Sequence, residues 1–202
     1  MSLNRDLLLR RMDPTTPWDE RLVIEPYFQE NIVEDSASVS IDFHLGSRFI
    51  VFQSSLSREH DLLSQDPAQD IRATDLFIPL GKVLTLRPGN IVLGTTLEWF
   101  RFPLDLMANV VGRSIWGRRG LLIVTASVVR PGSSGTITLE MSNLGDVGLN
   151  IRPGVAIGQL FFSRVEGERA ATPKRSYFSG ALRPIVGKYT LSRIEELFLN
   201  VK

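Results

Sequence analysis

The sequence predicts a mostly β protein, either a barrel or a sandwich, and three observations lead to this prediction. Short apolar runs recur through the second half of the chain with turn residues between them. One early segment alternates apolar and polar residues, which is typical of a strand with one buried face. Proline-glycine pairs directly precede several of the apolar runs, as tight turns leading into strands require.

The first 30 residues are expected to hold an amino-terminal helical segment. Leucines cluster on one side of residues 4–12, and Asp13, Pro14 and Pro17 then end the helix. We expect this helix to pack on the outside of the domain.

The alternating segment is residues 38–45, in which every second side chain is apolar. Gly46 is expected to end this strand, and residues 48–52 to form a second one. Residues 54–75 are polar and show no sustained period, which predicts a surface excursion. Further strands are expected at the apolar runs 76–80, 83–86, 91–97, 106–111, 121–124, 136–141 and 155–162.

The tripeptide Arg-Pro-Gly occurs three times, at residues 87–89, 130–132 and 152–154. Proline fixes φ near −65° and glycine tolerates a positive φ, so each copy predicts a type II turn. The flanking sequences differ, so these copies are turns and not an internal repeat.

Length and composition indicate one domain over residues 1–202, since 43% of the residues are hydrophobic and the chain can bury a core. The formal net charge is +1, so nothing indicates nucleic-acid binding, and any phosphate chemistry must be local. The first residues lack the apolar stretch of a signal peptide, and no run reaches the roughly 20 apolar residues of a membrane helix. We therefore expect a soluble, cytoplasmic protein with no membrane partner.

Cysteine is absent, which excludes disulfides, thiol nucleophiles and zinc sites with thiolate ligands. The two histidines, His44 and His60, have no partner at ligand spacing and are interpreted as structural. No protein metal site is predicted.

The densest polar cluster is Gly112 to Gly120, between two apolar runs. Its glycines allow backbone amides to face a ligand, and Arg113 and Arg118 can donate to phosphate oxygens. A triphosphate fits this chemistry, although the segment alone is also explained as a basic loop with solvated arginines. Further along, alternation in residues 136–141 puts Glu140 on the polar face of a strand, where a lone carboxylate is usually solvated or paired with an arginine.

In order and spacing these segments resemble the dCTP deaminase family of the dCTP deaminase/dUTPase superfamily. That family carries a Gly-Arg-Ser-Ser-Leu-x-Arg-x-Gly-Leu stretch, then Thr-Ala, an Asp-Pro-Gly turn and a strand ending in Leu-Glu. The matching segments here are residues 112–121, 125–126, 130–132 and 138–140. Residues 38–46, 86–98, 152–160 and the tail around Tyr177 and 187–189 are also similar, so the resemblance covers about residues 22–193.

The resemblance implies a distorted β-barrel of the dUTPase-like β-clip type with a few short helices, assembled as a homotrimer with sites at subunit interfaces. It also implies deamination without zinc. Glu140 would be the general base that activates water, Arg118 would orient Glu140 and the water, and Ala126 would contribute a backbone contact.

By the same resemblance the substrate is a deoxynucleoside triphosphate with Mg²⁺, held by one set of side chains and backbone groups. The tail, residues 170–202, would close over it. The expected substrate-binding residues are Arg113, Ser114, Ile115, Trp116, Gly117, Arg130, Thr138, Leu139, Gln159, Tyr177 and Lys188.

The chain departs from the family pattern at the Asp-Pro-Gly turn, where Arg130 replaces the aspartate. A guanidinium cannot accept a hydrogen bond from the sugar hydroxyl and has no lone pair for base chemistry. Ile115 also stands where a second serine is usual, and a histidine before Thr125 and a glutamine in the tail are missing.

The leading hypothesis is hydrolysis of dCTP to dUTP and ammonia in pyrimidine deoxynucleotide metabolism. One alternative is a dUTP diphosphatase or a bifunctional deaminase-diphosphatase, which Arg130 disfavours. A second is a catalytically impaired, nucleotide-binding regulatory homologue. A third is a structural trimer without a ligand, and the retained Arg113 and Arg118 argue against it.

Overall fold

The computed structural model describes most of the chain, namely residues 3–34, 39–52, 63, 73–166, 180–187 and 190–199. Tyr177 and Lys188, the two expected tail residues, lie outside the described residues, as does most of the 54–75 segment.

Strands dominate the structure, which confirms the mostly β prediction, and every apolar run expected to be a strand contains or overlaps one. The strands are β1 (Val23–Glu25), β2 (Ile32–Glu34), β3 (Val39–Phe52), β4 (Ala73–Phe77), β5 (Leu84–Leu86), β6 (Ile91–Thr96), β7 (Trp99–Arg101), β8 (Leu106–Gly112), β9 (Leu121–Ile123), β10 (Val128–Val129), β11 (Ser134–Gly135), β12 (Thr138–Asn143), β13 (Leu149–Ile151) and β14 (Ala156–Arg164). The end of the expected 54–75 excursion is therefore part of a strand, because β4 begins at Ala73.

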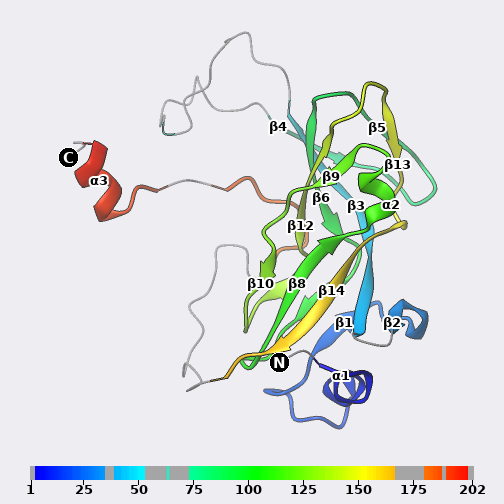
Figure 1. Ribbon diagram of the computed structural model, residues 1–202, viewed down its shortest axis with the longest axis vertical. Coiled ribbons are helices and arrows are strands. Elements are labelled where there is room, and N and C mark those ends of the chain that lie inside the picture. Colours follow the sequence, from blue (N-terminus) through cyan, green and yellow to red (C-terminus); the bar gives the residue numbers. More distant parts are fainter. Residues whose placement is uncertain are drawn as a thin grey trace.

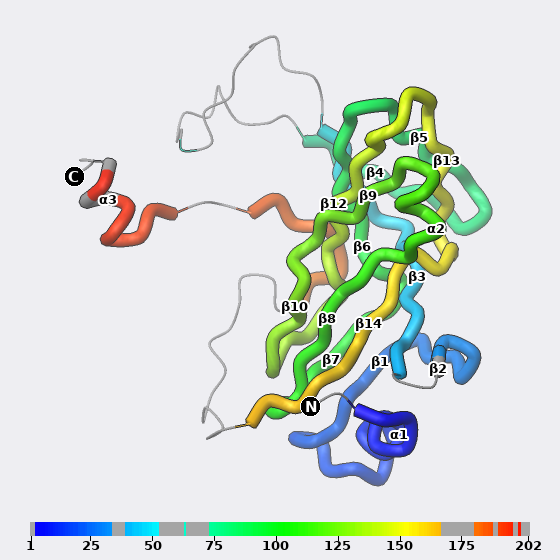
Figure 2. Tube along the Cα trace, in the orientation of Figure 1, coloured from blue at the N-terminus to red at the C-terminus, as the bar shows by residue number. Residues whose placement is uncertain are grey.

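The helices are short: α1 (Arg5–Met12), α2 (Ser114–Gly117), α3 (Arg193–Leu199) and one 3-10 turn, η1 (Gln29–Asn31). None of the described helices has the length and apolar character that crossing a membrane requires. Figure 2 shows that α3 lies apart from the strands at the carboxyl end of the trace.

One large antiparallel sheet organises the fold, in the order β10-β8-β14-β3-β6-β12-β9, with β2 and β4 also paired to β3. Figure 1 shows β8, β14 and β3 running side by side, with β6 and β12 continuing the sheet beyond β3. Two small sheets, β1-β7-β11 and β13-β5, complete the described part. The result is a curled half-barrel, in line with the expected distorted barrel.

Strand β3 is continuous, whereas the sequence predicted two strands separated by Gly46. The pairing of β3 with β6 changes register between Leu45 and Phe49, so the glycine marks an irregularity inside one strand. A Cβ at Gly46 would lie only 2.8 Å from the backbone oxygen of Thr96, closer than real Cβ atoms come. Glycine is required here for the close approach of two backbones and not to end the strand.

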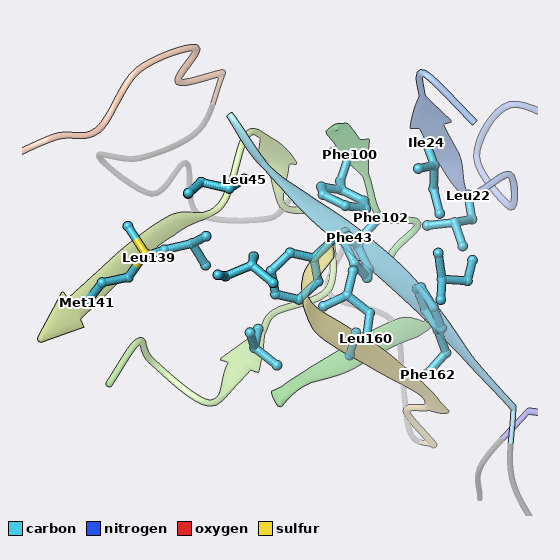
Figure 3. Packing of buried hydrophobic residues seen from close by; sticks show 14 of the residues in the cluster. Leu22, Ile24, Phe43, Leu45, Phe100, Phe102, Leu139, Met141, Leu160 and Phe162 are labelled. Atoms are coloured by element: carbon cyan, nitrogen blue, oxygen red, sulfur yellow. The ribbon is translucent and has the colours of Figure 1, made fainter. Parts of the chain in front are cut away.

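The core is lined by alternate residues of the central strands. Ile41, Phe43 and Leu45 of β3 are fully buried, as their alternation predicted. Figure 3 shows phenylalanines and leucines from several strands meeting in this core, among them Phe102 and Phe162. The rings of these two are stacked with centroids 5.9 Å apart.

The amino-terminal helix α1 begins after Asn4, whose side chain accepts a hydrogen bond from the Leu7 amide at 3.0 Å. Leu8 is fully buried, and Arg11 is 6% exposed and ion-paired with Asp105. The helix is therefore packed against the sheet. Between α1 and η1 the chain forms turns and β1, so α1 and the start of η1 are the helical parts of residues 3–30.

All three Arg-Pro-Gly tripeptides form the predicted turns. Gly89, Gly132 and Gly154 have φ of 71°, 73° and 87°. In each turn the amide that follows the glycine donates to the arginine carbonyl, at 3.2, 3.2 and 3.4 Å respectively. A positive φ at the third position and this hydrogen bond define type II turns.

Candidate active site

Strand β12 presents Glu140 on its polar face. Leu139 and Met141 are fully buried on the opposite face, while Thr138 and Glu140 are half-buried, as the alternation predicted. Leu93 of β6 is the cross-strand partner of Glu140, and the Val124 amide donates to the Glu140 backbone oxygen at 2.8 Å. Glu140 thus lies on a strand that is paired on both sides, and its cross-strand partner is apolar.

The Glu140 carboxylate has unused hydrogen-bonding capacity. Its Oε2 atom is buried and has no hydrogen-bond partner within the described residues. Leaving a buried acceptor unsatisfied costs about 1–3 kcal/mol, and most buried polar groups of native proteins have a hydrogen-bond partner. An oxygen in this position can accept a proton or a hydrogen bond from a bound water or ligand.

The Thr125 to Arg130 segment borders β12. The Thr125 hydroxyl donates to the Thr138 carbonyl at 2.7 Å, which fixes the loop after β9 against the polar face. Ala126 follows in that loop and is exposed. Arg130 is exposed at the start of its turn and has no side-chain partner within the described residues.

Hydrogen bonds to β14 hold the arginine-rich loop, which is residues 112–120. Strand β8 ends at Gly112, Arg113 caps the short helix α2, and the Arg113 amide donates to the Ile157 carbonyl at 3.2 Å. The Trp116 indole N–H donates to the Ala156 carbonyl at 2.9 Å, which gives this tryptophan a structural contact. Two hydrogen bonds thus pin the loop.

Around this loop, Ser114, Ile115 and Gly117 are exposed. The Ser114 side chain therefore remains accessible to a ligand, whereas the neighbouring Trp116 amide donates to the Arg113 carbonyl at 3.0 Å. Leu139 differs, because its side chain is fully buried in the core and cannot reach the polar face.

Two of the three arginines of the loop, Arg113 and Arg118, have different surroundings. Arg113 Nη1 donates to Asp42 Oδ2 at 2.9 Å, and Gln159 Nε2 donates to Asp42 Oδ1 at 2.8 Å. Arg118 is exposed and, among the residues that the structure describes, no side chain pairs with it. The structure thus joins Arg113 and Gln159 through Asp42, and leaves Arg118 available.

The predicted residues form two groups. Arg113 follows the end of β8 and Gln159 lies in β14, whereas Thr138 and Glu140 lie on β12. No hydrogen bond or ion pair joins the two groups in the described part of the chain. Strand β9 lies between them, since it pairs with β12 and contacts α2. Among the residues that the structure describes, no group of three or more histidine, aspartate or glutamate side chains could hold a metal ion.

Sequence reasoning missed two acidic residues. Asp42 was visible as the one carboxylate in an alternating strand, but its partners depend on strand register. Glu98 is fully buried and accepts hydrogen bonds from His44, which sequence reasoning had left without a partner. The Thr-Leu-Glu segment at residues 96–98 was the only signal for Glu98 in the sequence.

The tail segment is attached just before β12. The Gly180 amide donates to the Ser134 carbonyl, and the Thr136 amide donates to the Ala181 carbonyl, both at 2.8 Å. Gly180 and Ala181 therefore lie beside the residues that lead into the strand that carries Glu140.

Comparison with known proteins decides the family. The dCTP deaminase-like sequence family matches residues 11–165, which is most of the chain. The chain belongs to the dCTP deaminase-like family. As a member it is a dCTP deaminase-like hydrolase.

Individual relatives agree with this assignment. A dCTP deaminase of Halorubrum lacusprofundi is 37% identical over 147 residues, covering 72% of this chain and 70% of the relative. A dUMP-forming dCTP deaminase of Mycobacterium tuberculosis is 38% identical over 176 residues, covering 78% of this chain and 88% of the relative.

The fold is shared with a solved family structure. The 2'-deoxycytidine 5'-triphosphate deaminase from Agrobacterium tumefaciens superposes with a TM-score of 0.56 at 18% identity. The match covers 82% of this chain but 47% of that one, so this chain spans about half the length of the solved relative.

Proposed function

We propose that this protein hydrolyses dCTP to dUTP and ammonia without zinc, with Glu140 as the general base. The observation that carries the proposal is the buried, unpartnered Oε2 of Glu140 on the polar face of β12. The relatives that are at least 37% identical and named dCTP deaminases support the choice of substrate.

The reaction needs one proton acceptor that later donates. Water attacks C4 of the cytosine ring while its proton moves to Glu140. The proton then passes to the exocyclic nitrogen, the bond between C4 and this nitrogen breaks, and ammonia leaves. The remaining hydroxyl proton ends on ring N3 as C4 becomes a carbonyl. Atoms balance, because one water enters and one ammonia departs.

The arginine-rich loop is proposed to hold the triphosphate. Arg113 and Ser114 would donate to phosphate oxygens, and the backbone amide of the exposed Ile115 would add a further donor. Trp116 and Gly117 would line the loop beside it. Mg²⁺ would arrive as part of the substrate, bound to the phosphates. Tyr177, Lys188 and Arg130 complete the proposed binding set, together with Thr138 and Gln159.

A homotrimer with shared sites belongs to the proposal. Arg118 is unpaired and does not meet Glu140 within the described chain, so a neighbouring copy would have to bring the two groups together. Exposed apolar side chains near β8 and β9 support such a contact; Val111 is 45% exposed, Leu122 43%, Val124 57% and Val128 42%.

A second candidate is deamination coupled to release of diphosphate. The Mycobacterium tuberculosis relative is named a dUMP-forming dCTP deaminase, which favours this possibility. Against it stands Arg130, an exposed guanidinium where a carboxylate would be needed to activate water toward the α-phosphate.

The test is to incubate purified protein with dCTP and Mg²⁺ and to quantify ammonia, dUTP, dUMP and diphosphate. We expect ammonia and dUTP in equal amounts, and a loss of kcat of about 1,000-fold in Glu140→Gln, because an amide cannot take the proton. Equal amounts of dUMP and diphosphate would establish the second candidate. Nucleotide binding without ammonia release would identify a regulatory homologue and overturn the proposal.

A further inference from the structure

Three polar side chains from separate parts of the chain meet on the outer face of the sheet. Asp42 of β3 and Gln159 of β14 are register partners, and Arg113 follows the end of β8 beside them. Each oxygen of the Asp42 carboxylate accepts one hydrogen bond, from Gln159 at 2.8 Å and from Arg113 at 2.9 Å. The Asp42 side chain is 13% exposed and that of Arg113 is 39% exposed.

This arrangement fixes Arg113 without using all of its donors. The Arg113 amide is bound to Ile157, and its Nη1 is bound to Asp42. A guanidinium carries five N–H donors, and within the described residues no hydrogen bond occupies those on Nε and Nη2. The side chain is therefore held at one edge and has free donors beside the exposed loop.

We propose that Asp42 is a positioning residue that holds the Arg113 guanidinium in the orientation that binds the substrate's triphosphate. The inference rests on the proposed function, since it assigns Asp42 a part in the same site. An arginine already held in place loses little rotamer freedom on binding, so more of its interaction with phosphate contributes to affinity.

The same carboxylate also has an opposing effect. A negative charge 2.9 Å from the guanidinium cancels part of the attraction between Arg113 and an anion. If neutralisation were its main effect, removing the charge would tighten triphosphate binding. If positioning dominates, removing it weakens binding, so the sign of one measurement separates the two roles.

The experiment is a double-mutant cycle of Asp42→Asn and Arg113→Ala. Three quantities are measured: KM and kcat for dCTP with Mg²⁺, and the Kd of inorganic tripolyphosphate with Mg²⁺ by calorimetry. We expect Asp42→Asn to raise both KM and Kd about tenfold and to change kcat less than about threefold. In the Arg113→Ala background the same substitution should change Kd less than about twofold, because its partner is gone.

Two further variants serve as a control for net charge and as a second test of the proposal. Asp75→Asn removes an exposed carboxylate of β4 and should leave Kd within about twofold, which controls for net charge. Gln159→Met removes the second contact of Asp42 and should raise the Kd of tripolyphosphate by about threefold. This variant also tests the proposal if Asp42→Asn does not fold.

The outcomes separate this inference from the proposed function. Tighter or unchanged binding by Asp42→Asn, or an equal effect in the Arg113→Ala background, would overturn the positioning role even if dCTP is deaminated. Asp42-dependent tripolyphosphate binding without ammonia release would support the positioning role and overturn the proposed deamination. No tripolyphosphate binding by the wild-type protein would overturn the positioning role.

Discussion

Glu98 and Glu140 both have buried carboxylate oxygens, but the two carboxylates differ in their hydrogen bonds. Glu98 is fully buried and accepts from the His44 amide at 2.9 Å, while its Oε1 lies 2.6 Å from His44 Nδ1. Glu140 is half-buried, and its Oε2 has no partner within the described residues. The fold supplies hydrogen-bond partners for the Glu98 carboxylate but leaves one oxygen of Glu140 without a partner among the described residues.

The difference separates a structural role from a chemical one. A carboxylate whose lone pairs are taken by its own chain stabilises the fold and has little capacity for a ligand. An unsatisfied carboxylate costs stability, and this cost is tolerated where the group acts on something else. The comparison therefore supports a structural role for Glu98 and agrees with the proposed catalytic role of Glu140.

The largest expected effect comes from Glu140→Met, which replaces the carboxylate with an apolar side chain of similar length. Deamination should fall by at least about 1,000-fold, because no proton acceptor remains. The free energy of unfolding in urea should rise by about 1 kcal/mol, because a buried unsatisfied oxygen is removed. A clear loss of stability would mean that Glu140 is satisfied in the folded protein and would break the comparison.

Glu98→Gln should have the opposite result. The amide keeps the size of the side chain but presents an N–H where an acceptor is needed, so the free energy of unfolding should fall by about 3 kcal/mol. Activity per folded molecule should stay within about twofold of the wild type. Glu25→Gln, at an exposed position of β1, is the matched control and should change neither quantity. Loss of activity without loss of stability would place Glu98 in the site instead.

The smallest effect is expected for His44→Leu, which removes the ring contact to Glu98 and keeps the backbone one. The free energy of unfolding should fall by about 1 kcal/mol, less than for Glu98→Gln, because the His44 amide still donates. Urea unfolding of both variants side by side checks this order. If His44→Leu cost more than Glu98→Gln, the ring and not the amide would be the main partner.

Much of the fold could be predicted from sequence because the signals are local. Alternation in β3 and β12 places Phe43 in the core and Glu140 on the polar face, and Arg-Pro-Gly fixes three turns by backbone preference alone. Gly46 was misinterpreted because a strand end and a close backbone approach both require glycine. Which applies depends on a neighbouring strand far away in sequence.

The site was harder to predict because its contacts join residues that are far apart in the sequence. The arginine-rich loop and Glu140 could be singled out from their order along the chain. The bond from Arg113 to Asp42 depends on which strands are neighbours and in what register, and neither is visible in the local pattern. His44 was interpreted as unpartnered because Glu98 is 54 residues away along the chain.

The long strand β3 has a consequence for how the protein folds. It pairs with β14 on one side, and the bonded residues Asp42 and Gln159 are 117 residues apart in the sequence. During synthesis the edge of β3 that receives β14 therefore stays uncovered until most of the chain has emerged. Closing such long loops is slow, so we expect this protein to refold more slowly than proteins of similar size with mostly local contacts. Until β14 pairs with it, the exposed edge of β3 is prone to aggregation.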